Sequence, residues 1–283
     1  MTQLYDFAQV FAVLIGLCVG SFLNVCIARM PEDRSVVKPA SHCPACGTSI
    51  RPWDNIPLLS WLFLRARCRD CGTSISVLYP LIELMTGLIF WLVFRRVVPD
   101  AMALDQGHLL AAGLLMVFSA MLVGLTFIDL RHYIIPDEFS IYAAPIGIFG
   151  FWAVSALGAE PVVGATGWRD AVVGSFAGSG FLLAIMGAYW LVRRQEGMGM
   201  GDVKLLAMMG AFLGAVPAVP FILVLASMIG AVVGVGLVLF GERGLKTAVP
   251  FGPFLALAAM IYVLHGPEWV VRHLPGFALM FGL

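Results

Sequence analysis

Four cysteines in one hydrophilic segment form the most distinctive chemical pattern of the 283-residue sequence. Cys43 and Cys46 make one C-x-x-C pair, and Cys68 and Cys71 make a second pair after 21 intervening residues, with a glycine following each pair. Two such pairs can close a tetrahedral zinc site of four thiolates. Because such a site has no open coordination position, we expect a structural zinc ion that folds a segment too small to hold a core unaided.

A second pattern places carboxylates at the ends of apolar runs. Asp202 lies in Gly197-Met198-Gly199-Met200-Gly201-Asp202, where one apolar run gives way to another, and Asp129 closes an earlier run. A charge beside hydrocarbon is costly, and alternating glycines let a backbone approach closely. Two predicted spans separate the two aspartates, so both fall on the same face of the bilayer. The topology therefore allows them to meet.

Two carboxylates that share a water molecule can hydrolyse a peptide bond. One is ionised and takes a proton from the water, and the other is protonated and polarises the scissile carbonyl. Such a pair titrates as a unit and gives a bell-shaped pH profile. Non-catalytic interpretations remain open at this point: Asp202 as a helix N-cap, and Asp129 as the partner of Arg131 or Lys204.

Other catalytic classes find less support in the sequence. It contains no G-x-S-x-G and no H-E-x-x-H pattern, and its five histidines lie outside the interiors of the apolar runs. An ion-coupled transporter is the rival class, because membrane carboxylates also serve transport. Transport sites favour the bilayer midplane, whereas both aspartates lie at one edge.

The composition indicates an all-α polytopic membrane protein. Hydrophobic residues make up 60% of the chain and charged residues 12%, and the mean hydropathy is +0.94. Uninterrupted apolar runs exclude the alternation of barrel strands, so we predict about eight transmembrane helices. The runs lie near residues 7–27, 78–98, 109–128, 139–157, 170–192, 203–216, 220–240 and 250–265.

The distribution of positive charge orients the predicted bundle. If residues 28–77 are cytoplasmic, alternation places 13 of the 17 Lys and Arg residues inside, as the positive-inside rule favours. A reducing cytoplasm then disfavours disulfides among the four cysteines, although redox use of the pairs stays open. Arg95 and Arg96 are the exception, because they fall at the predicted outer face. Lys plus Arg and Asp plus Glu number 17 each, so net charge gives no indication of a nucleic-acid partner.

We accordingly divide the chain into four parts. Residues 1–27 form the first transmembrane helix, and residues 28–77 form a zinc-ribbon-like cytoplasmic insert between helices 1 and 2. Residues 78–265 form the membrane bundle with the paired aspartates, and residues 266–283 form a C-terminal tail of unassigned structure.

Four motifs together resemble the bacterial type IV prepilin peptidases, a family of GxGD aspartyl proteases that also act as N-methyltransferases. They are Gly199-Met200-Gly201-Asp202 with Lys204; the Asp129 segment ending in Ile135-Pro136-Asp137; the four cysteines; and Gly20-Ser21-Phe22-Leu23-Asn24-Val25 leading to Arg29-Met30-Pro31. A lone GxGD is a weak signal, but four motifs in the family's order, spanning about residues 16–252, are a specific one.

The resemblance implies a bifunctional enzyme of the bacterial inner membrane, with its active site at the cytoplasmic face. Such enzymes remove the basic leader of type IV prepilins or type II secretion pseudopilins and methylate the new N-terminus with S-adenosylmethionine. Asp129 and Asp202 become the catalytic pair, and the four cysteines become the ligands of Zn²⁺. The remaining expected partners are the lipid bilayer and the apolar N-terminal helix of the substrate. The supporting active-site loop is expected to comprise Gly199, Gly201, Lys204, Pro136 and Asp137.

The methyltransferase site is harder to place. Ser21, Asn24, Arg29 and Glu83 are polar and converge on the cytoplasmic ends of the first two predicted spans, where they could bind the cofactor or the substrate amine. Capping and helix–helix hydrogen bonds explain them equally well, and the sequence shows no Gly-rich cofactor loop of the soluble type. A peptidase without methyltransferase activity therefore stays open as an alternative.

Overall fold

The computed structural model describes residues 2–160, 162–195, 199–239 and 249–280, and within these ranges the chain is built from helices without a named strand. Six helices are long and apolar enough to cross a membrane: α1 Thr2–Arg29, α3 Leu78–Val97, α4 Gln106–His132, α6 Trp168–Arg193, α8 Ala218–Leu239 and α9 Gly252–His273. Two shorter helices, α5 Ala144–Ala156 and α7 Met200–Leu213, occupy the other predicted runs. The predicted all-α polytopic fold is confirmed.

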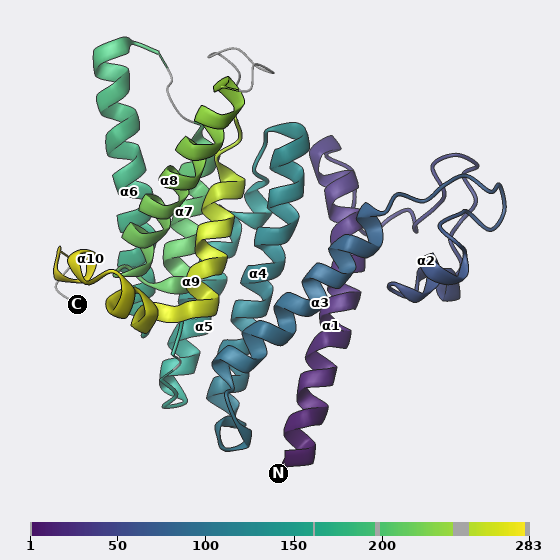
Figure 1. Cartoon of the computed structure of the whole chain (residues 1–283), viewed down its shortest axis with the longest axis horizontal. Coiled ribbons are helices and arrows are strands. Elements are labelled where there is room, and N and C mark those ends of the chain that lie inside the picture. The colour runs from purple at the N-terminus through teal and green to yellow at the C-terminus, as the bar shows by residue number, and fades with distance from the viewer. Residues whose placement is uncertain (1, 161, 196–198, 240–248, 281–283) are drawn as a thin grey trace.

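The long helices run up and down side by side, and the loops divide between two ends of the bundle (Figure 1). In that view the insert between α1 and α3 lies beside the bundle and extends from near the start of α3 to about the middle height of α1, and the segment that follows α4 lies at the upper end. The insert holds short helices only, η1 Met30–Glu32, η2 Pro52–Asn55 and α2 Leu59–Phe63. The remaining 3₁₀ turns are η3 Ala101–Ala103, η4 Asp137–Phe139 and η5 Ile141–Ala143.

The short helix α7 is the buried centre of one half of the bundle. Every residue from Val203 to Leu213 except Lys204 is buried, and α7 contacts α4, α5, α6, α8 and α9. A helix that is apolar on all sides is stable only when neighbours surround it. The first residues of α7 are therefore held at a fixed place at the upper end of the bundle.

Glycines let α6 and α7 approach closely. A Cβ atom on Gly174 would lie 2.3 Å from the carbonyl oxygen of Gly210, and one on Gly210 would lie 2.1 Å from that of Gly174. The obstructing atoms belong to backbone, so they cannot rotate away. Small residues at helix crossings are the usual means of close packing in membranes.

The two arginines at the lower end have partners that the sequence did not indicate. Arg96 donates a hydrogen bond to the carbonyl oxygen of His265 and pairs with Glu268, both on α9. The Arg95 guanidinium lies over the ring of Trp91, 5.1 Å from its centroid. The first part of the predicted tail belongs to α9, which kinks at Gly266, where φ is 79°, and the short helix α10 Pro275–Met280 follows.

The α6–α7 contact generates a test of the packing. Gly174→Val inserts side-chain atoms into the α7 backbone, and overpacking of this kind costs about 1–3 kcal/mol. We expect a clear fall in the thermal unfolding midpoint of the purified protein in detergent. Gly180→Val is the matched control, because Gly180 lies on the same helix, is exposed, and has open space where a Cβ would go. Equal midpoints for the two variants would contradict the described packing.

Candidate active site and metal centre

Asp129 lies in the last turn of α4, at the upper end of the bundle. The helix ends because Tyr133 adopts the left-handed conformation, with φ of 57°, and its amide donates to the Asp129 carbonyl oxygen at 2.9 Å. The Asp129 side chain is buried, with 4% of the residue exposed. Within the described residues it forms no ion pair, because Lys204 pairs with Asp137 instead. The interpretation of Asp129 as the partner of Lys204 is therefore wrong.

Asp202 lies in the first turn of α7. Gly199 occupies the N-cap position, and the Asp202 amide donates to the Gly199 carbonyl oxygen at 3.3 Å. The N-cap interpretation of Asp202 is thus wrong, and its carboxyl group is free for other contacts. That group is close enough to Asp129 for the two charges to interact. The structure therefore places both carboxyl groups at the same end of the bundle, where the span count predicts them.

The N-terminus of α9 completes the site. The backbone of Gly252 lies against the Asp129 carboxylate, where its amide interacts with the charge of that group. A Cβ atom at position 252 would lie 2.5 Å from Asp129 Oδ2, so only glycine allows the backbone to approach this far. Sequence reasoning missed Gly252, although Gly252-Pro253 at the start of the last long helix could have indicated a close backbone approach.

The segment between α4 and α5 links the two aspartates. Its Asp137 accepts two hydrogen bonds from Lys204 Nζ, at 2.7 and 3.0 Å, and thereby ties this segment to α7. Pro136 precedes η4 and its carbonyl oxygen accepts from the Ser140 hydroxyl at 2.8 Å. Gly201 faces Ile135, whose Cβ would lie 3.2 Å from an added Cβ. Of the five residues predicted to support the site, Pro136 and Asp137 lie in this segment, Lys204 and Gly201 contact it from α7, and Gly199 caps α7 and is exposed.

The four residues predicted for methyl transfer separate into two pairs. Ser21 and Arg29 line a cavity of about 320 Å³ between α1 and the insert. Asn24 instead donates to the carbonyl oxygens of Gly20 and Tyr79, and Glu83 Oε2 accepts from the amide of Leu58 at 2.8 Å. The second pair thus fastens α1 to α3 and α3 to the insert.

The cavity has a polar and an apolar wall. From α1 it is lined by Cys18, Ser21, Phe22, Val25 and Arg29, and from the insert by residues of 36–41 together with Asn55 and Pro57. Arg29 is buried and donates to the carbonyl oxygens of Ser35 and Pro39, at 3.0 and 2.8 Å. Its guanidinium therefore shapes the wall of the cavity.

The four cysteines of the insert converge. Their sulfur atoms all lie within 4.8 Å of one another, and those of Cys43 and Cys71 lie 3.8 Å apart. A tetrahedral zinc ion with Zn–S bonds of about 2.3 Å requires sulfur atoms about 3.8 Å apart. All six cysteines of the chain are free thiols. The geometry of the cluster thus fits a Cys₄ zinc site.

Each cysteine pair belongs to the same local structure. Residues 43–50 read C-P-A-C-G-T-S-I and residues 68–75 read C-R-D-C-G-T-S-I. In both, the glycine amide donates to the first cysteine's carbonyl oxygen, at 2.8 and 2.9 Å, and the glycine φ is 72°. The positive φ explains the glycine at each turn. The sequence therefore contains two copies of one cysteine turn.

The threonine of each turn lowers the pKa of a cysteine thiol. Hydrogen bonding with the Thr73 side chain, and then with its backbone, lowers the pKa of Cys71 to about 6. The Thr48 side chain and backbone likewise lower the pKa of Cys46. A thiolate is the form that binds metal. Both second cysteines are thus prepared as ligands.

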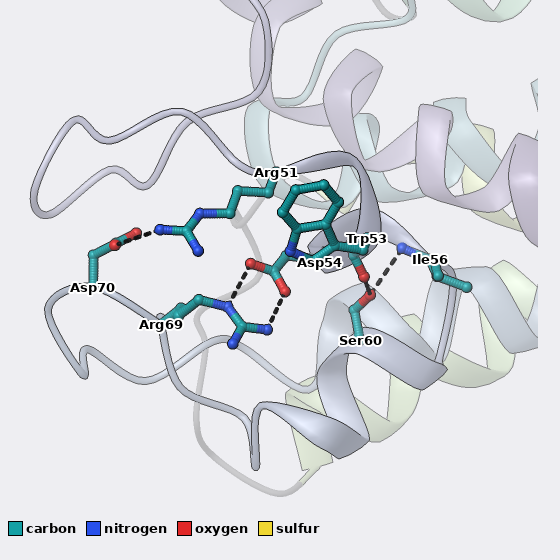
Figure 2. Close-up of polar contacts among 7 residues, drawn as sticks. All are labelled: Arg51, Trp53, Asp54, Ile56, Ser60, Arg69 and Asp70. Atoms are coloured by element: carbon teal, nitrogen blue, oxygen red, sulfur yellow. Dashed lines mark hydrogen bonds and ion pairs between the residues drawn. The ribbon is translucent and has the colours of Figure 1, made fainter.

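A set of ion pairs holds the insert together, as Figure 2 shows. Arg69 donates two hydrogen bonds to the Asp54 carboxylate, one from Nε at 2.8 Å, and this contact lowers the pKa of Asp54. Arg51 lies 3.6 Å from Asp70. The Ser60 hydroxyl accepts from the amide of Ile56 and donates to the carbonyl of Trp53. The second cysteine turn is thereby joined to η2 and α2.

Comparison with known proteins agrees with these features. The family model described as the bacterial peptidase A24 N-terminal domain matches residues 14–97, and that of the type IV leader peptidase family matches residues 116–235. No solved structure gives a significant match.

Similar proteins named prepilin leader peptidase/N-methyltransferase match over nearly their whole length. The one from Myxococcus xanthus is 39% identical over 96% of this chain and 95% of its own. The protein from Aeromonas hydrophila is 39% identical over 96% of this chain and 94% of its own length. The protein from Stutzerimonas stutzeri is 34% identical over 93% of this chain and 92% of its own length. By these sequence matches, this chain belongs to the type IV leader peptidase family.

Proposed function

We propose that this protein is an aspartyl endopeptidase of the bacterial inner membrane. It removes the basic leader of type IV prepilins or type II secretion pseudopilins and methylates the new N-terminus. The observation that carries the proposal is the placement of two carboxyl groups, from α4 and α7, at one end of the bundle and within range of each other's charge. The relatives of this chain are named prepilin leader peptidase/N-methyltransferase.

The pair supplies both parts of peptide hydrolysis. One carboxylate removes a proton from a water molecule, whose oxygen attacks the scissile carbonyl carbon, while the protonated partner donates to the carbonyl oxygen. The C–N bond then breaks, and a proton passes to the leaving amine. The Gly252 amide orients the Asp129 carboxylate throughout, because it is fixed to the start of α9.

Access to the pair is from the end of the bundle. Gly199 and Met200 are exposed and Asp202 is half-buried, whereas Asp129 is buried. A substrate segment at the membrane edge therefore reaches Asp202 first. The distribution of Lys and Arg assigns this end to the cytoplasm, where a basic leader would lie before cleavage.

Methyl transfer uses a second place at the same end of the bundle. We assign S-adenosylmethionine to the cavity between α1 and the insert, because the cavity of about 320 Å³ offers the Ser21 hydroxyl beside apolar walls. When bound there, the cofactor would supply a methyl group to an amine. Ser21 and Val25 would contact it, and Arg29 would hold the wall through Ser35 and Pro39. Zinc in the cysteine cluster would hold the other side of the insert together.

Replacing either aspartate tests the peptidase site. Asp129→Asn and Asp202→Asn each remove an acid–base group, so leader cleavage of a purified prepilin should fall by about 10²–10⁴-fold or more. Mass analysis of the product N-terminus measures this. Asp6→Asn, at the opposite end of α1, is the control and should cleave normally. Near-normal cleavage by either test variant, in protein that inserts and unfolds as wild type, would refute the assignment.

Replacing the cysteines tests the metal centre. Cys46→Ser or Cys71→Ser removes one thiolate of four, so the zinc content of the purified protein, measured by plasma mass spectrometry, should fall to near zero. Limited proteolysis should then cut within 28–77, because the insert lacks a core of its own. Cys18→Ser, on α1 and outside the cluster, should keep its zinc. A metal-free wild-type protein with a protease-resistant insert would contradict the structural role.

Filling the cavity tests the cofactor site. Val25→Trp places a large ring in the space between α1 and the insert, so binding of radiolabelled S-adenosylmethionine should weaken at least about tenfold, or 1.4 kcal/mol. Methylation should fall in parallel, while leader cleavage continues at the aspartates. Leu14→Trp, on the exposed side of α1, is the control. Unchanged cofactor binding by the Val25 variant would place the methyltransferase site elsewhere.

A further inference from the structure

The insert exposes a continuous apolar surface around α2. Leu59, Leu62 and Phe63 are 49%, 62% and 82% exposed, and Trp53 and Ile56 of the preceding segment are 62% and 46% exposed. We call these five residues the α2 patch. Leu59, Leu62 and Phe63 share one face of the helix because they are three and four residues apart.

The opposite side of α2 already packs within the insert. Ser60 is buried and hydrogen-bonded to Trp53 and Ile56, and the Trp61 indole donates to the Ile75 carbonyl oxygen at 3.2 Å. A small rotation of α2 would therefore not bury the α2 patch inside the insert, because the inward side of the helix is already packed. Exposed apolar surfaces of this kind mark sites that contact a lipid membrane or another protein.

The patch lies beside the membrane-spanning helices. Glu83, more than one turn inside the spanning helix α3, accepts a hydrogen bond from the Leu58 amide, which directly precedes α2. In Figure 1 α2 accordingly lies lower than the upper ends of α1 and α4, at about the middle height of these two helices. A bilayer that surrounds α1 and α3 therefore reaches the height of α2.

Positive charge follows the patch directly. Arg65 and Arg67 are exposed, and among the described residues neither has an ion-pair partner, whereas Arg51 and Arg69 pair with Asp70 and Asp54. Apolar and aromatic side chains beside unpaired arginines are the usual composition of segments that lie in an anionic membrane interface.

We propose that the α2 patch inserts into the lipid leaflet on the insert's side of the membrane, with Arg65 and Arg67 at the anionic headgroups. Attachment of the insert to the membrane then has three points: the end of α1, the start of α3, and α2. The proposal concerns a lipid contact and does not depend on the catalytic assignments, so it can fail while leader cleavage stands.

Photo-crosslinking of the full chain in nanodiscs tests the proposal. Benzoylphenylalanine placed at position 63 should form lipid adducts, identified by mass spectrometry, in nanodiscs of phosphatidylcholine and phosphatidylglycerol. The same group at position 49, which is exposed on the first cysteine turn, should give few lipid adducts. Arg65→Gln with Arg67→Gln, or removal of phosphatidylglycerol, should lower the yield at position 63 at least about threefold, because arginines bind anionic surfaces.

Three results would overturn the lipid contact. Crosslinks from position 63 to a second copy of the chain would show a dimer interface, and crosslinks mainly to an added prepilin would show a substrate-docking surface. Equal lipid yields at positions 63 and 49, or no adduct at either, would show that the patch faces water. Zinc content of each variant, compared with the wild type, confirms that the insert is folded in every sample.

Discussion

The close approach of the Gly252 backbone to the Asp129 carboxylate is the contact on which the rest of the site depends. An apolar bundle tolerates a buried carboxylate only where a donor meets it. That donor is available because α9 begins at this point and because glycine leaves no Cβ in the way. The position of Asp202 depends in turn on α7, which the backbone contact between Gly174 and Gly210 fixes against α6. Helix packing therefore sets the geometry of the two carboxyl groups.

The two proposed reactions, peptide hydrolysis and methyl transfer, belong to separate halves of the molecule at one end of the bundle. The carboxyl pair belongs to α4, α7 and α9, whereas the cavity belongs to α1 and the insert. The two family models divide the chain in the same way, at residues 14–97 and 116–235. Asn24 and Glu83 hold the first half together as a unit through their bonds to Tyr79 and Leu58. A cleaved substrate would thus keep its helix in the bilayer while its new N-terminus moves between the halves.

Much of the arrangement follows from sequence, because hydrophobicity and charge act over whole segments. The eight apolar runs, the position of the insert and the shared end of Asp129 and Asp202 all come from run length and alternation. Contacts between distant segments do not follow in this way. Gly252 near Asp129, Glu268 beside Arg96 and Leu58 bonded to Glu83 join positions whose proximity depends on helix rotation and tilt, which hydropathy does not specify. For that reason the sequence could not specify Leu58 as the partner of Glu83.

Zinc bound by both cysteine turns would make the segment between them a closed loop. Zinc at the four sulfur atoms would join the turn at Cys46 to the turn at Cys68, and the 21 residues between them contain η2 and α2. Closing a loop of this length lowers the conformational entropy of the unfolded insert. The insert therefore loses less conformational entropy when α2 packs beside α3. Zinc occupancy would then control how rigidly the segment between the turns is held, even though α2 supplies no ligand to the zinc.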